Sequence, residues 1–229
     1  IGNNGEKEGI KTHPQKFINT MKNKLIAIAL FAMSACNSPS KWQNGEVVVE
    51  ASTKILDGYG KQIVNYQDSI SAIFLSGSNG VLSKKDVSAL GHLHFYEPNE
   101  TYKFPAVFTK IEDGKVFQMK TNTDRLPEYR TYGSLRFEMD GVAHSLTLYQ
   151  SVEMPEYLFC PFKDLTNGNE TYGGGRYLDF KLDDLKEPII DFNYCYNPYC
   201  AYNSEYSCPI PPYENHLKVN IPAGEKKWH

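Results

Sequence analysis

Two adjacent segments with alternating apolar residues constrain the fold of this chain more than any other feature. Residues 131–139 and 142–151 each carry large apolar side chains at every second position. That period of two is typical of a β-strand with one buried face. Between them, Asp140-Gly141 is a dipeptide that favours the tight turn of a β-hairpin. The sequence therefore predicts an antiparallel hairpin at the centre of the fold.

Similar segments flank this hairpin and extend the prediction to a whole sheet. A second turn signal, Glu112-Asp113-Gly114-Lys115, separates two of them. The six further predicted strands are 101–111, 115–121, 157–162, 176–182, 188–194 and 216–222. Eight short strands separated by turns indicate a mainly β fold, with a single antiparallel β-barrel or β-sandwich-like domain.

One helical segment precedes the strands. Residues 47–74 spread apolar side chains among acidic and amide neighbours, as an amphipathic helix does. Gly58 and Gly60 lie inside this segment, and glycine weakens a helix. We therefore expect two shorter helical pieces rather than one continuous helix.

The N-terminal region has the order of features found in a secretory signal. Lys22 and Lys24 precede nine apolar residues, 25–33, which are too few to cross a bilayer as a helix. Small residues then precede Cys36, an arrangement that resembles a bacterial lipobox, in which the cysteine is acylated. The alternative is a buried apolar helix with an incidental cysteine. The lipobox interpretation divides the chain into an upstream translated extension (1–20), a signal peptide (21–35), a tether (36–46) and a single globular domain (47–229).

Charge and the lipid signal together favour an envelope location. The whole chain has a net charge of −3, and residues 1–35 hold five lysines and two glutamates, so residues 36–229 carry −6. An acidic domain is not suited to nucleic acid. We expect the protein to be anchored to a membrane by its N-terminal lipid, in the outer membrane and facing the periplasm, with a small ligand or an envelope protein as its partner.

Four cysteines remain when Cys36 is lipidated, and the envelope permits disulfides. Cys200 and Cys208 enclose a short loop rich in proline and tyrosine, so we predict a disulfide between them. Free buried thiols and a metal-binding pair are the alternatives. The spacing of cysteines and histidines does not match a zinc site, and we expect neither a metal nor a cofactor.

The segment 159–215 concentrates the candidate site residues. Gly173, Gly174 and Gly175 precede Arg176, and a glycine turn followed by a guanidinium is a plausible cradle for a carboxylate or phosphate. The alternative is a tight turn in which Arg176 pairs with a nearby aspartate, Asp179 or Asp191. The residues predicted to bind a ligand are Tyr172, Arg176, Asn193 and Asn197.

Carboxylates in the same segment are the candidates for acid–base catalysis. We single out Glu170, Asp191 and Glu214, because different surroundings can separate the pKa values of carboxyl groups, and of these Glu170 and Asp191 are the candidate bases. Asp191 and Asn193 share one face of the predicted strand over 188–194. The sequence contains neither a serine-hydrolase elbow nor a zinc-protease motif.

This C-terminal segment resembles the bacterial and archaeal family called domain of unknown function 1684. The resemblance is carried by Phe159–Asp164, Thr166–Asp179, Asp191–Tyr202, Cys208–Leu217 and Ala223-Gly224-Glu225. It extends over roughly residues 50–229 and is closest to a short lipoprotein form typical of Bacteroidetes-like bacteria. The resemblance implies no substrate, cofactor or catalytic residue.

Three functions remain open on the sequence. The first is an envelope lipoprotein that binds a small polar or anionic ligand or acts as a scaffold. The second is a hydrolase-type enzyme that uses Glu170 or Asp191 as a base, with Arg176 stabilising developing charge. In the third, the C-terminal motifs serve the architecture alone.

Overall fold

The computed structural model of this 229-residue chain describes residues 11–12, 57–78, 80–83, 85–87 and 92–228. The predicted signal peptide, Cys36 and the tether lie outside the described residues. Within the described residues, no helix has both the length and the apolar character that crossing a membrane requires.

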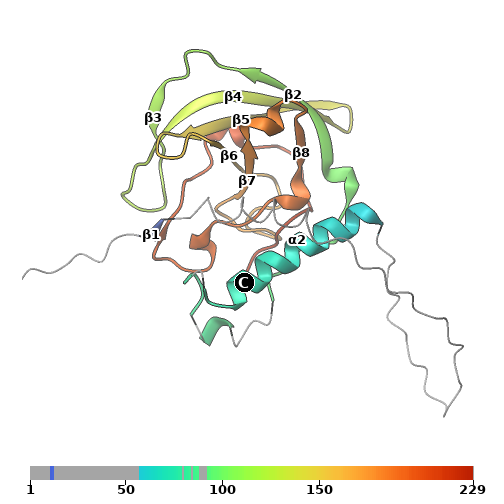
Figure 1. Ribbon diagram of the computed structural model, residues 1–229, viewed down its shortest axis with the longest axis vertical. Coiled ribbons are helices and arrows are strands. Elements are labelled where there is room, and N and C mark those ends of the chain that lie inside the picture. Colours follow the sequence, from blue (N-terminus) through green and yellow to red (C-terminus); the bar gives the residue numbers. More distant parts are fainter. Residues whose placement is uncertain (1–10, 13–56, 79, 84, 88–91, 229) are drawn as a thin grey trace, which may run out of the picture.

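The fold is dominated by one antiparallel sheet of seven strands. Their order is β7-β6-β5-β4-β2-β8, and β3 pairs with a second stretch of β4. The sheet curls into a half-barrel, and its longest strands arch over the top of the molecule in Figure 1. The predicted mainly β class is thus confirmed. The strands are β2 (Lys103–Lys110), β3 (Val116–Gln118), β4 (Glu128–Met139), β5 (Val142–Ser151), β6 (Tyr157–Phe162), β7 (Arg176–Lys181) and β8 (Ile189–Asp191).

The predicted central hairpin is formed by β4 and β5. Met139 pairs with Val142, so Asp140 and Gly141 make a two-residue turn. Both turn residues have positive φ angles, 52° and 75°, as the favoured hairpin turn requires. The side chains of Leu135 and Leu146, which pair with each other, are fully buried in the concave core of the sheet.

The two edge strands approach each other through the segment that follows β8. Tyr177 of β7 and Tyr196 exchange two backbone hydrogen bonds, of 2.9 and 3.1 Å. This short bridge links the β7 edge to the segment that follows β8. Strands β7 and β8 are the two ends of the sheet, and we call the opening between them the seam.

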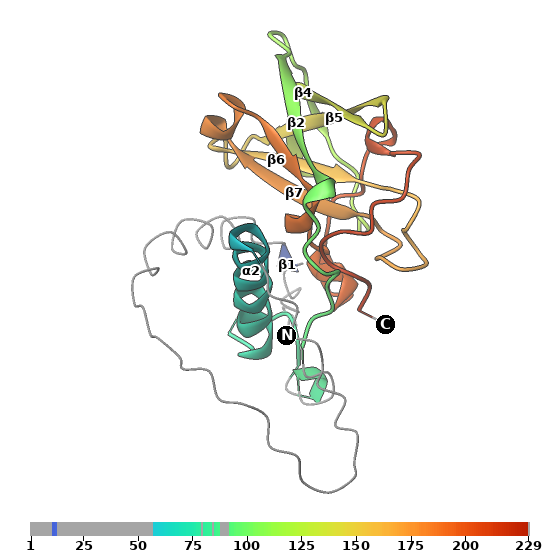
Figure 2. The ribbon, with the colours of Figure 1, turned by 90° about the vertical axis from the view of Figure 1, so that its right-hand side faces the viewer.

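Helix α2 (Gly58–Leu75) covers the lower part of the molecule, beneath the sheet (Figure 2). It buries Ile63, Tyr66, Ile70 and Phe74, whose spacing places them along one face. Residues 47–56 lie outside the described residues, so the expected division into two helical pieces stays a prediction. In the described part the helix begins at Gly58, and Gly58 and Gly60 lie in its first turn. There the side chain of Asp57 caps the helix by accepting a 2.6 Å hydrogen bond from the backbone N–H of Gly60.

The chain also contains a short parallel strand pair and several 3₁₀ turns. Strand β1 (Lys11–Thr12) pairs in parallel with β9 (Tyr206–Ser207). The 3₁₀ turns are η2 (Glu100–Tyr102), η3 (Leu182–Leu185), η4 (Phe192–Tyr194), η5 (Tyr199–Ala201) and η6 (Tyr213–Asn215).

Two strand predictions near the C-terminus need correction. Residues 216–222 form no regular strand. They lie beside the segment that follows β6 and are held to it by isolated backbone hydrogen bonds, such as that from Leu217 N–H to the Lys163 carbonyl at 2.8 Å. The predicted strand over 188–194 ends at Asp191, because the Asp191 carboxylate accepts a hydrogen bond from Asn193 N–H and caps η4. Asp191 and Asn193 therefore belong to one capping turn rather than to alternate positions of a strand.

Candidate functional site

Arg176 is buried completely and is bound by the protein itself. Its guanidinium forms a 2.7 Å ion pair with Asp164, whose side chain is also fully buried. It also donates hydrogen bonds to the backbone carbonyls of Ile221, Ala223 and Glu225. Of the nitrogen atoms of this guanidinium, Nε has no hydrogen-bond partner in the described part of the chain. The predicted cradle is therefore filled by carbonyl groups and a carboxylate of the same chain, and it leaves no surface of Arg176 open to a ligand.

The glycine before Arg176 makes this close packing possible. Gly175 has a φ angle of 97°, and a Cβ atom there would lie 2.6 Å from the Phe162 carbonyl oxygen. An L-residue with a side chain would be strained in that conformation and would also clash. The glycine run thus positions β7 against β6.

Three further predicted site residues each contact a different partner. The buried Asn197 donates from its side chain to the Lys226 carbonyl at 2.7 Å. The Tyr172 hydroxyl lies 3.7 Å from the Cys200 sulfur. Glu170 accepts a 2.9 Å hydrogen bond from the Tyr96 hydroxyl. Neither Glu170 nor Asp191 is among the groups that contact Arg176 in the described part of the chain.

The four described cysteines are free thiols, so the structure lacks the disulfide that we predicted between Cys200 and Cys208. The two residues are nevertheless neighbours, because Cys200 N–H donates to the Cys208 sulfur at 3.2 Å. A hydrogen bond from the Cys208 thiol lowers the pKa of Cys200. Nothing in the described residues groups three metal-ligating side chains around a common point.

A cavity at the seam between β7 and β8 brings Asp191 together with residues from the N-terminal half. Its volume is about 210 Å³, and its polar walls are formed by Tyr59 and Gln62 of α2, Lys103 of β2 and Asp191 of β8. We call it the seam pocket. At roughly 30 Å³ per water molecule, it has room for about seven waters or a similarly small organic molecule.

Apolar side chains complete the seam pocket. Leu178 and Phe180 come from β7, and Ile189 comes from β8. The first two are buried, whereas Ile189 is 47% exposed and lies where solvent can reach the cavity. A small cavity with an apolar wall and a few convergent polar groups is the usual form of a ligand site.

Asp191 is the most constrained polar group of the seam pocket. The Tyr59 hydroxyl donates to its carboxylate, at 3.1 Å from Oδ1 and 3.0 Å from Oδ2. The backbone N–H and the side-chain amide of Asn193 donate to Oδ1, at 3.0 and 2.9 Å. Burial raises the pKa of Asp191, although these hydrogen bonds oppose the shift.

Asn193 and Tyr59 hold this group in place. The Asn193 amide also donates to the Tyr59 hydroxyl at 2.8 Å and to the Asn99 carbonyl at 2.9 Å. Burial, followed by the charge of Asp191, raises the pKa of Tyr59 well above its usual value. Tyr59 therefore stays protonated and remains a donor to Asp191 at physiological pH.

The pattern of the sequence did not reveal Tyr59, Gln62 or Lys103 as members of a site. Tyr59 is 132 positions away from Asp191, and no local motif links them. A further residue that the sequence did not reveal is Glu225, whose carboxyl-bearing side chain belongs to a residue only 2% exposed. It accepts a hydrogen bond from Asn197 N–H at 2.8 Å and another from the Tyr202 hydroxyl. Burial raises the pKa of Glu225 to about 7.

Comparisons with known proteins identify a matching family model and a similar solved structure. A family model described as protein of unknown function (DUF1684) matches residues 88–226. Among solved structures, the solution NMR structure of an uncharacterized protein from Haloarcula marismortui is 30% identical and has a TM-score of 0.59. The match covers 72% of this chain and 92% of that chain. No curated protein matches the sequence.

Proposed function

Since this chain belongs to the DUF1684 family of proteins of unknown function, we propose a function from its own geometry: it binds a small polar ligand in the seam pocket. The observation that carries this proposal is the meeting of Asp191, Tyr59 and an apolar wall around one small cavity. Most buried polar groups of the C-terminal segment already bind each other. The seam pocket differs because its polar groups border open volume.

Binding is better supported than hydrolysis. A hydrolase of the kind considered above requires a base close to a group that stabilises developing negative charge. Arg176, the candidate for that second role, is enclosed by Asp164 and three backbone carbonyls. Asp191 instead accepts hydrogen bonds from neutral donors of Tyr59 and Asn193, and these hold its carboxylate in a fixed position.

A ligand screen with a blocked pocket tests this proposal. We would record ligand-detected NMR spectra of small amines, sugars, carboxylates and amides with the wild-type protein and with Ile189→Trp. The larger side chain at this half-exposed position fills the seam pocket without entering the core. The matched control is Val142→Trp, at another exposed position that does not line the pocket.

The proposal predicts that at least one class of compound binds to the wild type and to Val142→Trp but not to Ile189→Trp. Absence of binding to the wild type would contradict it. Equal binding to all three proteins would place the ligand elsewhere on the molecule.

We also propose that the protein is a lipoprotein of the cell envelope, anchored through Cys36 in the outer membrane and facing the periplasm. The order of a short basic region, nine apolar residues, small residues and Cys36 supports this. Membrane fractionation and mass spectrometry of the N-terminal peptide test it, with Cys36→Ser as the control. A soluble protein that retains residues 21–35 would contradict the proposal.

A further inference from the structure

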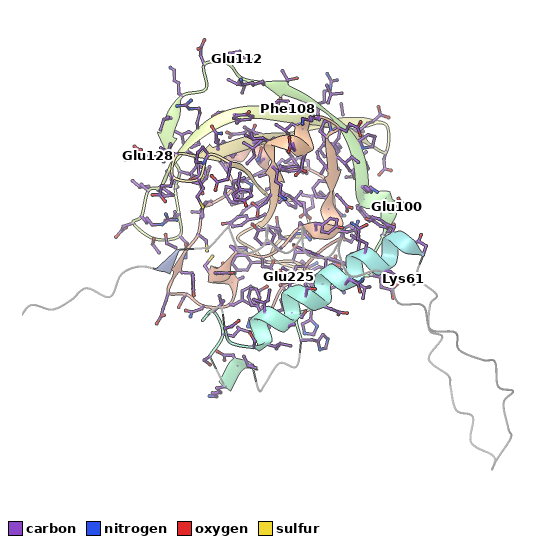
Figure 3. All side chains as sticks on the ribbon, in the orientation of Figure 1. Lys61, Glu100, Phe108, Glu112, Glu128 and Glu225 are labelled. Atoms are coloured by element: carbon purple, nitrogen blue, oxygen red, sulfur yellow. The ribbon has the colours of Figure 1, made fainter. Side chains whose placement is uncertain are left out.

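The charged groups around the seam pocket do not balance each other. Lys103 lines the pocket and forms a long, exposed ion pair with Glu100 at 3.7 Å. Burial raises the pKa of Asp191, and the charge of Lys103 opposes that shift. In Figure 3, Lys61 marks the end at which α2 begins, and Glu100 of η2 is seen near that end. In the described part of the chain, the hydrogen-bond donors to the Asp191 carboxylate are the neutral groups of Tyr59 and Asn193.

A second carboxylate makes the same side of the seam pocket more negative. Asp179 lines the pocket and is buried, and it accepts a 2.7 Å hydrogen bond from the neutral Tyr196 hydroxyl. The residues that line the pocket thus carry two carboxylates, Asp179 and Asp191, against the one ammonium group of Lys103. A bound cation would offset the cost of burying these negative charges.

The aromatic groups of the seam pocket also suit a cation. The ammonium group of Lys103 lies 4.8 Å from the centre of the Tyr59 ring, within the range of a cation–π contact. Tyr194 supplies a second ring to the wall, and its hydroxyl accepts a 2.7 Å hydrogen bond from the Gln62 amide. The Tyr59 ring therefore already holds one ammonium group in this structure.

We propose that the ligand of the seam pocket is a small organic cation, such as a protonated primary amine. Its ammonium group binds the Asp191 carboxylate beside the Tyr59 and Tyr194 rings. Its carbon chain lies along Leu178, Phe180 and Ile189. This inference rests on the proposed function, because it names the chemical class of the ligand that the pocket binds.

Three compounds of equal chain length and different charge separate this inference from its alternatives. We would titrate n-butylammonium, butyramide and butyrate into the protein by isothermal titration calorimetry. We expect n-butylammonium to bind at least about tenfold more tightly than either of the others, since a charge-assisted hydrogen bond is stronger than a neutral one.

Asp191→Asn removes the charge and keeps the shape, and its side-chain oxygen still caps η4. We expect this variant to lose about tenfold or more of the affinity for n-butylammonium. The matched control is Glu214→Gln. Glu214 also accepts a hydrogen bond from a tyrosine hydroxyl, that of Tyr149 at 2.7 Å, but it does not line the seam pocket. This control should keep the affinity of the wild type.

Lys103→Met gives an independent test, because it removes the positive charge that shares the Tyr59 ring. The inference predicts tighter binding of n-butylammonium in this variant. If Lys103 instead served as the anchor for an anionic ligand, the variant would lose affinity for butyrate. That second result would overturn the inference.

The outcomes for the inference and for the proposed function are distinct. Tighter binding of butyramide or butyrate, lost in Ile189→Trp, would refute the cation but keep the seam pocket as a ligand site. Binding of n-butylammonium that does not change in Asp191→Asn would also refute the inference. If none of the three compounds binds and the wider NMR screen is negative, both proposals fail.

Discussion

Replacing the buried Arg176 with methionine should destabilise the fold by about 4 kcal/mol while leaving the seam pocket intact. Methionine keeps a long, flexible side chain of similar length but removes the charge and every donor. The variant therefore leaves the Asp164 carboxylate buried without the ionic partner that Arg176 provides. It also removes the donor shared by the backbone carbonyls of Ile221, Ala223 and Glu225.

The magnitude follows from these contacts. Breaking one side of a buried ion pair costs about 3–5 kcal/mol. The Oδ1 atom of Asp164 keeps its hydrogen bonds from Thr166 and from Ile221 N–H, which favours the lower end. The carbonyls that lose a charged donor add to the cost. We therefore expect a value near the middle of the range.

Equilibrium unfolding in urea, followed by circular dichroism, measures this loss. Lys186→Ala is the matched control, because it breaks an exposed ion pair with Asp183 at 3.0 Å and should change the free energy of unfolding by less than about 1 kcal/mol. Adding Asp164→Asn to Arg176→Met should recover part of the stability, since it removes the uncompensated charge. The reasoning is refuted if Arg176→Met is as stable as the wild type, and equally if the variant folds but no longer binds a ligand in the seam pocket.

Three further predictions concern the buried C-terminal segment. Burial raises the pKa of Glu225 from 4.5 to about 7, so between these pH values the unfolded chain releases a proton that the folded chain keeps. The free energy of unfolding should therefore fall by up to about 3 kcal/mol as the pH rises from 4.5 to 7, and Glu225→Gln should abolish this fall; an unchanged pH profile in that variant would contradict the assignment. Alkylation of the native protein should modify Cys200 before Cys160 and Cys195, because burial raises the pKa of the latter two thiols, and peptide mass mapping would reveal a different order. Asn215→Ala should lower stability by about 2–3 kcal/mol in urea unfolding, because it removes three buried hydrogen bonds to β5 and β6; a change below about 0.5 kcal/mol would show that these bonds contribute little.

Local patterns in the sequence predicted the sheet well because each depends on neighbouring residues. The hairpin at Asp140 and Gly141 is an example, since its turn preference and its alternating strands lie within one short segment. The helix also follows its apolar spacing. A capping aspartate, Asp57, makes glycine acceptable in the first turn of this helix.

The candidate site was harder to predict because it depends on contacts between distant segments. Arg176 stood out as a binding residue, yet its partners are Asp164 and carbonyl groups some 45 to 49 positions away. Asp191 lines the seam pocket, but the predicted strand face shared with Asn193 does not hold. The strand ends there, and the partner that shapes the pocket, Tyr59, comes from a helix far earlier in the chain.

The central claim, that the seam pocket is the ligand site, is tested most directly by mapping backbone chemical shifts while n-butylammonium is added. The account predicts that the largest changes fall on Leu178, Phe180, Ile189 and Asp191, and that they disappear in Ile189→Trp. Changes centred on Tyr96 and Lys226, which line a separate groove, would contradict the account, as would the absence of any change.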